Sequence, residues 1–220
     1  DLGAYSSRPG ATHISEDEEK NRIIKVVELL AKEFPKANLS IDTFRSSVAN
    51  ECLSAGACVI NDITASEYDS EILKIAHKHN APYIMMHMKG MPGNMMKNNK
   101  YNNLIKDILY YFSKKIEDAR TAKVNDIIID PGFGFSKDID QNYSLLKNLD
   151  LLKSLNLPIL VGLSRKSMIY KLLKTTPEYA LNGSTTLNTI ALLNGASILR
   201  VHDVKEAMEC IKITNQFNKQ

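Results

Sequence analysis

Short apolar runs alternate along the chain with longer segments in which apolar residues recur every three or four positions. The runs occupy residues 37–43, 57–63, 81–88, 125–132, 157–164 and 196–203. Because consecutive positions are apolar, these runs predict strands that are buried on both faces. Such strands are typical of a parallel sheet covered by helices, so the pattern predicts an α/β fold.

The segments between the runs predict amphipathic helices. In the first of them Ser15 and Glu18 have the spacing of a capping box. One apolar stripe is expected on this helix, formed by Ile23, Val26, Val27, Leu30 and Phe34. Further helices are predicted at 67–79, 102–121, 140–155, 165–174, 182–194 and 203–217. Gly56 and Gly195 stand where helix ends need a left-handed residue.

The strand–helix repeat has no break in composition and no linker, so residues 1–220 are predicted to form a single domain. Residues 88–103 form the longest irregular stretch and predict a loop. Six strands are counted, and the opening residues have the character of the tail of a seventh. A (β/α)₈ barrel needs eight strands and a doubly wound sheet needs fewer, so the count leaves both open.

Composition narrows the class of protein. The net charge is +3, and basic and acidic residues are mixed along the chain, so no nucleic-acid partner is indicated. The three cysteines are odd in number and lack C-x-x-C spacing, which argues against a disulfide framework and a zinc site. With neither a long apolar stretch nor a signal peptide in the sequence, we expect a cytoplasmic protein without a membrane partner.

Polar side chains stand at the end of each apolar run, where a buried strand would not tolerate them without a reason. They are Asp42, Asn61, Asp62, His87, Asp130, Ser164, Arg165, Lys166, Arg200, His202 and Asp203. The carboxyl ends of parallel strands point to one face of an α/β barrel or sheet, and ligands bind at that face. The pattern therefore predicts a binding site built from strand ends.

Each of these polar residues also has a structural interpretation. Thr43, Asp62 and Asp203 serve equally well as caps of the helices that follow them. His87 lies among methionines and is interpreted as a core residue, outside the site. Asp130, like Asp42, directly follows an apolar run, and a buried carboxylate needs a partner.

Lys166 and its neighbour Arg165 open a helix, where a positive charge opposes the helix dipole, and this placement favours a functional role. The strand ends together offer carboxylates and an amide that suit the edge of a nitrogen heterocycle. They also offer an Arg-x-His pair that suits a phosphate. No zinc-protease, dinucleotide or P-loop motif is present. A heterocycle that carries a phosphate leaving group is the predicted ligand.

Seven stretches, in this order, resemble the dihydropteroate synthase family, the folate-pathway enzymes that sulfonamides target. The stretches are DLGAYSSRPGA (1–11), SIDTFR (40–45), VINDIT (59–64), MMHMKGMPGNM (85–95), DIIIDPGFGFSK (126–137), ILVGLSRKSMI (159–169) and NGASILRVHDV (194–204). Singly most of them are weak, but their shared order across the whole chain is specific. The resemblance implies a TIM (β/α)₈ barrel.

The resemblance also implies the reaction, which joins p-aminobenzoate to 6-hydroxymethyl-7,8-dihydropterin diphosphate and releases pyrophosphate. It assigns catalysis to Asp130, Lys166 and Arg200. The implied substrate contacts are Asp42, Asn61, Asp130 and Lys166 to the pterin, Met86 and Phe135 as its apolar walls, Arg200 and His202 to the diphosphate, and Ser167, Ser7 and Arg8 to p-aminobenzoate. The resemblance further implies that Mg²⁺ is the cofactor, that protein residues alone form no metal site, and that the protein is a homodimer.

Relative to the family, residues 1–11 match the end of the second barrel strand and its loop. A barrel that is incomplete at its N-terminus is therefore expected, without the family's Asn-x-Thr-Pro-Asp-Ser-Phe loop. Two alternatives stay open: a methyltetrahydrofolate-type methyltransferase and a non-catalytic pterin-binding module. The SRKS and RVHDV stretches favour the synthase, because a methyl-carrier enzyme has no diphosphate to hold.

Overall fold

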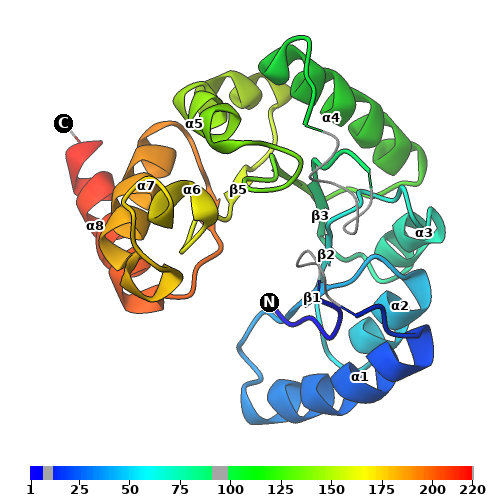
Figure 1. Cartoon of the computed structure of the whole chain (residues 1–220). Coiled ribbons are helices and arrows are strands. Elements are labelled where there is room, and N and C mark those ends of the chain that lie inside the picture. The colour runs from blue at the N-terminus through cyan, green and yellow to red at the C-terminus, as the bar shows by residue number, and fades with distance from the viewer. Residues whose placement is uncertain (7–11, 91–98, 220) are drawn as a thin grey trace. The chain divides into compact units, whose positions relative to one another are not determined.

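The computed structural model describes residues 1–6, 12–90 and 99–219. Strands and helices alternate along the chain (Figure 1). In chain order they are α1 (Glu16–Glu33), β1 (Ser40–Asp42), α2 (Ser46–Ser54), β2 (Val59–Asp62), α3 (Glu71–Lys78), β3 (Tyr83–Met86), α4 (Leu104–Thr121), β4 (Ile127–Asp130), α5 (Ile139–Lys147), the 3₁₀ helix η2 (Leu149–Leu155), β5 (Leu160–Val161), α6 (Ser167–Tyr170), the 3₁₀ helix η3 (Pro177–Tyr179), α7 (Leu181–Leu193), β6 (Ile198–Leu199) and α8 (Val204–Phe217). Within the described ranges, no helix has the length and apolar character needed to cross a bilayer.

The chain divides into two compact units. Unit 1 comprises residues 1–95 and 111–129, and unit 2 comprises residues 96–110 and 130–220. All six predicted strands are present, each shorter than its apolar run. The single domain expected over residues 1–220 stays a prediction, and each unit is described by itself.

Unit 1 is built on a sheet with the strand order β1-β2-β3-β4. β1 pairs in parallel with β2, and β2 pairs in parallel with β3. Ile41, Ile60 and Tyr83 are fully buried, which explains why the sequence runs are apolar. Helices α1, α2 and α3 follow one another along this sheet, α1 packing on α2 and α2 on α3 (Figure 1).

The opening residues extend this sheet beside β1. The N–H of Leu2 donates to the carbonyl of Ser40 at 2.8 Å, and the N–H of Asp42 donates to the carbonyl of Leu2 at 2.7 Å. These bonds make a parallel bridge between Leu2 and Ile41. The expected strand tail is thus confirmed.

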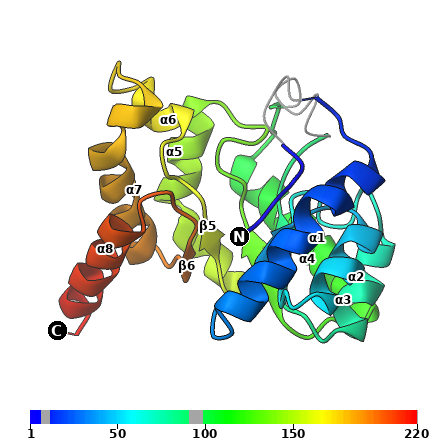
Figure 2. The same cartoon turned by 90° about the horizontal axis from the view of Figure 1, so that it is seen from below.

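Unit 2 contains the parallel pair β5 and β6, and its helices α7 and α8 pack against each other (Figure 2). The helix predicted at 140–155 is wrong as a single element, because α5 ends and the 3₁₀ helix η2 begins around Asn148. Leu149 and Leu152 are fully buried. Their spacing of three residues puts both on one face of a 3₁₀ helix, which has three residues per turn.

The apolar stripe predicted on α1 is narrower than expected. Ile23 and Val27 are buried, but Val26 is 44% and Phe34 is 59% exposed. Residue 26 lies about 100° around the helix from residue 27, which turns it away from the buried line. Glu19 continues that line and is fully buried, so the stripe contains a carboxylate that needs a partner.

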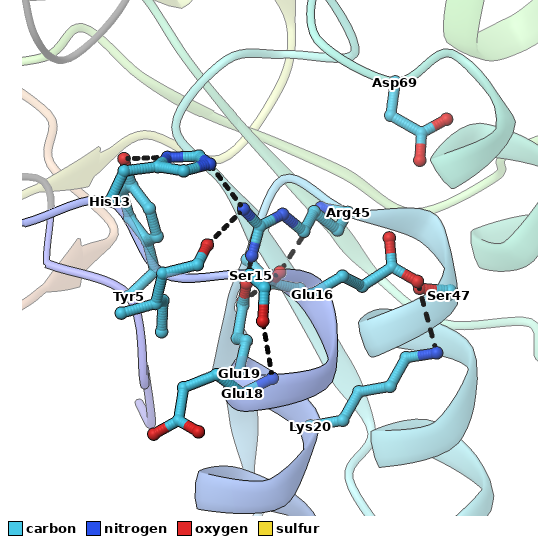
Figure 3. A network of polar contacts seen from close by, with 12 residues as sticks. Tyr5, His13, Ser15, Glu16, Glu18, Glu19, Lys20, Arg45, Ser47 and Asp69 are labelled. Atoms are coloured by element: carbon cyan, nitrogen blue, oxygen red, sulfur yellow. Dashed lines mark hydrogen bonds and ion pairs between the residues drawn. The ribbon is translucent and has the colours of Figure 1, made fainter.

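Arg45, at the start of α2, is that partner (Figure 3). Its guanidinium forms a buried ion pair with Glu19, and the Thr43 hydroxyl donates to Glu19 at 2.7 Å. Arg45 also donates to the Ile14 carbonyl at 2.8 Å and lies 5.5 Å from the ring centroid of Tyr5. The pair therefore ties α1 and the segments before it to the end of β1.

Replacing Arg45 by methionine is expected to lower the free energy of unfolding by about 3–5 kcal/mol, because Glu19 stays buried without its cation. Removing both charges with Glu19→Gln and Arg45→Met should recover part of this loss. Urea denaturation measures the free energy of unfolding of each variant. Lys74→Met is the matched control, since Lys74 pairs with Glu71 at the surface. Equal losses in Arg45→Met and Lys74→Met would contradict a structural role for the buried pair.

Candidate active site

Asp130 ends β4, and its carboxylate turns back onto the loop that follows the strand. The N–H of Gly132 donates to Asp130 Oδ1 at 2.8 Å, and the residue is 9% exposed. Burial raises the pKa of the Asp130 carboxyl, and the positive charge of Lys166 opposes this rise most strongly. Weaker opposition comes from the Gly132 N–H, then Lys137 and then Arg200. Unit 2 thus surrounds a buried acid with cations.

Lys166 precedes α6 as its N-cap, in extended conformation. Its Nζ donates to the Phe133 carbonyl and lies 4.6 Å from the ring centroid of Phe135, within range of a cation–π interaction. Burial lowers the pKa of the Lys166 ammonium to about 8, against the opposing pull of Asp130, and Arg200 lowers it further. A lysine tuned to this range is able to change charge near neutral pH.

The loop passes close beside the stem of Lys166 at Gly134. Gly134 has a φ of +79°, and a Cβ at this position would lie 3.1 Å from Lys166 Cδ. Glycine satisfies both conditions because it has no side chain and adopts positive φ freely. The second glycine of DPGFGF, Gly134, therefore allows the loop to pass close to the Lys166 side chain.

Arg200 and His202 follow β6. The Arg200 N–H donates to the Val161 carbonyl at 2.9 Å, which continues the pairing with β5. The Ser164 hydroxyl accepts from the His202 N–H at 3.2 Å and lies 3.0 Å from His202 Nδ1. Ser164 therefore orients the imidazole, and both Arg200 and His202 are exposed.

Arg165, which the sequence grouped with Lys166, has a different role. It has a φ of +56° and binds Asp203 with two hydrogen bonds, Nε to Oδ2 at 3.0 Å and Nη2 to Oδ1 at 2.6 Å. Asp203 stands at the N-cap position of α8. This bidentate pair links the end of β5 to the end of β6 and uses the charge of Arg165 structurally.

In unit 1, Asp42 and Asn61 are direct neighbours at the ends of β1 and β2. Asn61 Nδ2 donates to Asp1 Oδ2 at 3.1 Å. A Cβ on Gly3 would lie 3.1 Å from Asp42 Cβ, so glycine lets the opening segment run close to β1. Two of the predicted pterin ligands are therefore adjacent at one edge of this sheet.

Met86 and His87 follow next along the same edge. Met86 ends β3 and is buried, and its carbonyl accepts from the Tyr111 hydroxyl at 3.2 Å. His87 is buried, and the centroid of its ring lies 4.8 Å from the centroid of the Tyr111 ring in an edge-to-face arrangement. This packing agrees with the interpretation of His87 as a core residue.

Asp62 is a structural carboxylate. It accepts from the Tyr83 hydroxyl at 2.6 Å, from the Thr64 N–H at 2.8 Å and from the Ser66 N–H at 2.8 Å, and it is fully buried. Burial raises the pKa of the Asp62 carboxyl, and these bonds oppose the rise. Its oxygens hold the turn after β2, whereas the next helix, α3, has Ser70 at its N-cap position, so the expected helix cap is wrong and Asp62 stabilises the turn instead.

Comparison with known proteins shows the family. The model of the family "Pterin binding enzyme" matches residues 1–202. The chain belongs to this family. It is 42% identical over 216 residues to the dihydropteroate synthase of Escherichia coli (strain K12), a match that covers 97% of this chain and 76% of the relative.

Solved structures of pterin-binding enzymes agree. The dihydropteroate synthase of Yersinia pestis, solved as a sulfonamide drug complex, matches with a TM-score of 0.93 and 42% identity over 98% of this chain and 78% of that one. The enzyme of Thermus thermophilus, solved with 4-aminobenzoate, matches with a TM-score of 0.92 and 33% identity over 98% of this chain and 82% of that one. The predicted α/β TIM-barrel class is confirmed. Within the family the chain groups with the dihydropteroate synthases, transferases of folate biosynthesis.

The predicted site residues of this pterin-binding enzyme fall into three groups. Unit 2 brings Asp130, Phe135, Lys166 and Arg200 into mutual contact or electrostatic reach, and it places His202 two residues after Arg200 and Ser167 next to Lys166. Unit 1 places Asp42, Asn61 and Met86 at successive strand ends. Ser7 and Arg8 lie outside the described residues.

Two buried residues are not among the predicted site residues, Lys137 in the loop after β4 and Asn142 on α5. Lys137 is 2% exposed and Asn142 is 3% exposed, and both bind backbone atoms of this loop. A lysine after a glycine-rich turn carries no pattern that distinguishes a buried ammonium from a solvated one. The only available signal was that Lys137 closes the DIIIDPGFGFSK stretch.

The described residues contain no group of three or more His, Cys, Asp or Glu side chains suited to hold a metal ion. Asp130 is a poor ligand for a resident cation, because it already accepts from the Gly132 N–H and has Lys166 and Arg200 as cationic neighbours. In proteins Mg²⁺ is usually bound through one or two carboxylates together with substrate phosphates and waters. A cage made only of protein groups therefore does not fit these residues.

Proposed function

We propose that the chain catalyses the dihydropteroate synthase reaction through Asp130, Lys166 and Arg200. The observation that supports this assignment best is the buried Asp130 carboxylate with Lys166 and Arg200 as its cationic neighbours. The substrates are 6-hydroxymethyl-7,8-dihydropterin diphosphate and p-aminobenzoate. The products are 7,8-dihydropteroate and pyrophosphate.

In the proposed reaction the bond between the pterin methylene carbon and the diphosphate oxygen breaks, and pyrophosphate leaves with the electron pair. The positive charge left on the pterin is delocalised over its ring, where the Asp130 carboxylate stabilises it. The lone pair of the p-aminobenzoate nitrogen then forms the new carbon–nitrogen bond, and that nitrogen loses a proton to solvent. No covalent enzyme intermediate is needed.

Each remaining side chain has a binding role in this proposal. Lys166 donates to the pterin and is held in place by Phe133 and Phe135, the latter also serving as an apolar wall. Arg200 and His202 bind the diphosphate with charged hydrogen bonds. Because Ser164 engages His202 Nδ1, Nε2 is the nitrogen assigned to the phosphate oxygen.

The family resemblance supplies further assignments, which are part of the proposal. They treat residues 1–220 as one pterin-binding domain. They are Asp42 and Asn61 as additional pterin ligands, Met86 as a second apolar wall, Ser167 as a contact of p-aminobenzoate, and Ser7 and Arg8 in a loop over that substrate. The described residues fit no protein-only metal cage, so we assign Mg²⁺ to the substrate diphosphate and derive no step through it.

A homodimer is also part of the proposal. Unit 2 exposes apolar side chains on its paired helices, among them Leu193 on α7 and Met208, Ile213 and Phe217 on α8. Such side chains favour burial against a second subunit. The cytoplasmic location expected from the sequence stays a prediction.

Pterin turnover is expected to fall as the pH rises through about 8, because the Lys166 ammonium, whose pKa is about 8, loses its proton there. Below that pH the lysine is charged and binds; above it, one donor and one positive charge beside Asp130 are lost. The measurement is kcat/KM for the dihydropterin diphosphate between about pH 6 and 10.

Lys166→Arg should move this basic limb out of the measured range, since arginine stays charged throughout. Lys171→Arg is the matched control, an exposed lysine of the same segment, and should leave the limb in place. A limb that persists unchanged in Lys166→Arg would refute the assignment to Lys166. Absence of turnover at every pH by the folded, unmodified chain would refute the proposed function itself.

A further inference from the structure

Lys137 lies buried inside the loop that follows β4. Lys137 is only 2% exposed. Lysine is almost never fully buried unless its ammonium is paired. Nζ donates to the Gly132 carbonyl at 3.0 Å and to the Phe135 carbonyl at 3.0 Å. The ammonium therefore sits within the turn and binds the backbone on two sides.

These two carbonyls belong to the part of the loop that carries the proposed pterin contacts. The Gly132 N–H binds the Asp130 carboxylate, and the Phe135 ring lies under Lys166. The Phe135 N–H also donates to the Gly132 carbonyl at 3.1 Å. Lys137 thus connects, through a single side chain, the segment that orients Asp130 with the segment that carries the apolar wall.

The same loop is also held by Asn142 on α5, through hydrogen bonds of its own. Asn142 Oδ1 accepts from the Gly134 N–H at 2.7 Å, and its Nδ2 donates to the Lys137 carbonyl at 3.2 Å and the Asp138 carbonyl at 2.6 Å. Because α5 begins with the complete capping box of Asp138, this anchor is a rigid element. The loop therefore has an anchor on α5 in addition to Lys137.

Lys137 also acts on Asp130 through its charge. Its positive charge opposes the rise in the pKa of the Asp130 carboxyl that burial causes, as do the charges of Lys166 and Arg200 and the Gly132 N–H. Without the Lys137 ammonium, Asp130 would take up a proton at higher pH. A protonated Asp130 would not stabilise a positively charged pterin.

We propose that Lys137 is a positioning residue of the pterin site, which fixes the Asp130–Phe135 segment through its two hydrogen bonds to the Gly132 and Phe135 carbonyls. This inference rests on the proposed function. It adds a residue that does not touch substrate and acts through Asp130 and Phe135. It also predicts different effects on the KM values of the two substrates, because Lys137 supports only the groups assigned to the pterin.

The test is Lys137→Met, which keeps the length of the side chain and removes the charge and the donors. Folding is first checked by circular dichroism and thermal unfolding. We expect the KM for the dihydropterin diphosphate to rise about tenfold or more, as for the loss of charged hydrogen bonds, while the KM for p-aminobenzoate stays nearly unchanged. The acid limb of kcat/KM should move to higher pH.

Lys147→Met is the matched control, an exposed lysine of α5 that should alter neither constant nor the pH profile. A folded Lys137→Met enzyme with an unchanged acid limb, or with equal changes in both KM values, would overturn the proposal. An inactive unmodified enzyme would instead remove the proposed function on which it rests.

If Lys137→Met does not fold, Lys137→Arg takes its place, since it keeps the charge but changes the donor geometry. The proposal then expects an unchanged acid limb together with a raised KM for the pterin substrate alone. A shifted acid limb, or equal effects on both substrates, would overturn it. Asn142→Ala adds a second measurement, because loss of the anchor on α5 should raise the same KM without moving the acid limb.

Discussion

Replacing Asp130 by asparagine is expected to lower kcat about 100- to 1000-fold, the loss typical of removing one preorganised electrostatic contact to a transition state. Asparagine has the same shape, and its oxygen is able to accept from the Gly132 N–H as the carboxylate does. The loop should therefore keep its structure. What is lost is the negative charge that stabilises the pterin cation when the diphosphate leaves.

Steady-state turnover with both substrates measures this loss. Asp126→Asn is the matched control, because Asp126 lies just before the opposite end of β4 and is exposed. An Asp130→Asn enzyme as active as the Asp126→Asn enzyme would show that the buried carboxylate has no part in the chemistry. Circular dichroism of both variants separates a loss of catalysis from a loss of fold.

Arg200→Ala is expected to weaken binding of the diphosphate-bearing pterin about 10- to 100-fold, the effect of losing charged hydrogen bonds. Binding of plain 6-hydroxymethyl-7,8-dihydropterin should change little, since that ligand has no anion for Arg200 to hold. Calorimetric titration of the variant with each ligand measures the difference. The side chain is exposed, so the substitution leaves no cavity in the core.

The decisive quantity is the ratio of the affinities for the pterin with and without its diphosphate. Arg120→Ala, at an exposed arginine of α4, is the control for a general loss of positive charge and should leave the ratio unchanged. Equal weakening of both ligands by Arg200→Ala would contradict a diphosphate role. It would also reopen the methyltransferase alternative, whose ligand carries no diphosphate.

The sequence predicted those parts of the fold that depend on local pattern. Every apolar run contains a strand, because strands buried on both faces need consecutive apolar residues. Gly56 and Gly195 both have positive φ where the sequence placed helix ends. The helix α2 that Gly56 follows was not itself predicted, since its apolar residues lie within a short segment of nine residues.

Long-range pairing explains what the sequence did not predict. The carboxylate in the stripe of α1 depends on Arg45, which lies 26 residues further along the chain. Arg165 and Lys166 are neighbours with similar side chains, yet Arg165 is paired with Asp203 and Lys166 is directed to Phe133. The hydropathy pattern contains no information about such distant partners. It therefore does not distinguish a structural arginine from a functional one, or a buried lysine from an exposed one.

Of the predicted strand-end polar groups, Asp62 illustrates the same limit. Its position at the end of β2 resembles that of Asp130 at the end of β4, and both residues are buried. Asp62 is held by Tyr83, Thr64 and Ser66, whereas Asp130 has cations beside it. The difference lies in the surroundings that the fold supplies to each acid, which the residue pattern alone does not contain.

A calorimetric titration of the unmodified chain with 6-hydroxymethyl-7,8-dihydropterin diphosphate in the presence of Mg²⁺ tests the pterin site most directly. We expect saturable binding of one ligand per chain, which Asp130→Asn should weaken strongly. Failure of the folded chain to bind this ligand, or equal binding by the folded Asp130→Asn variant, would contradict a pterin site built around Asp130.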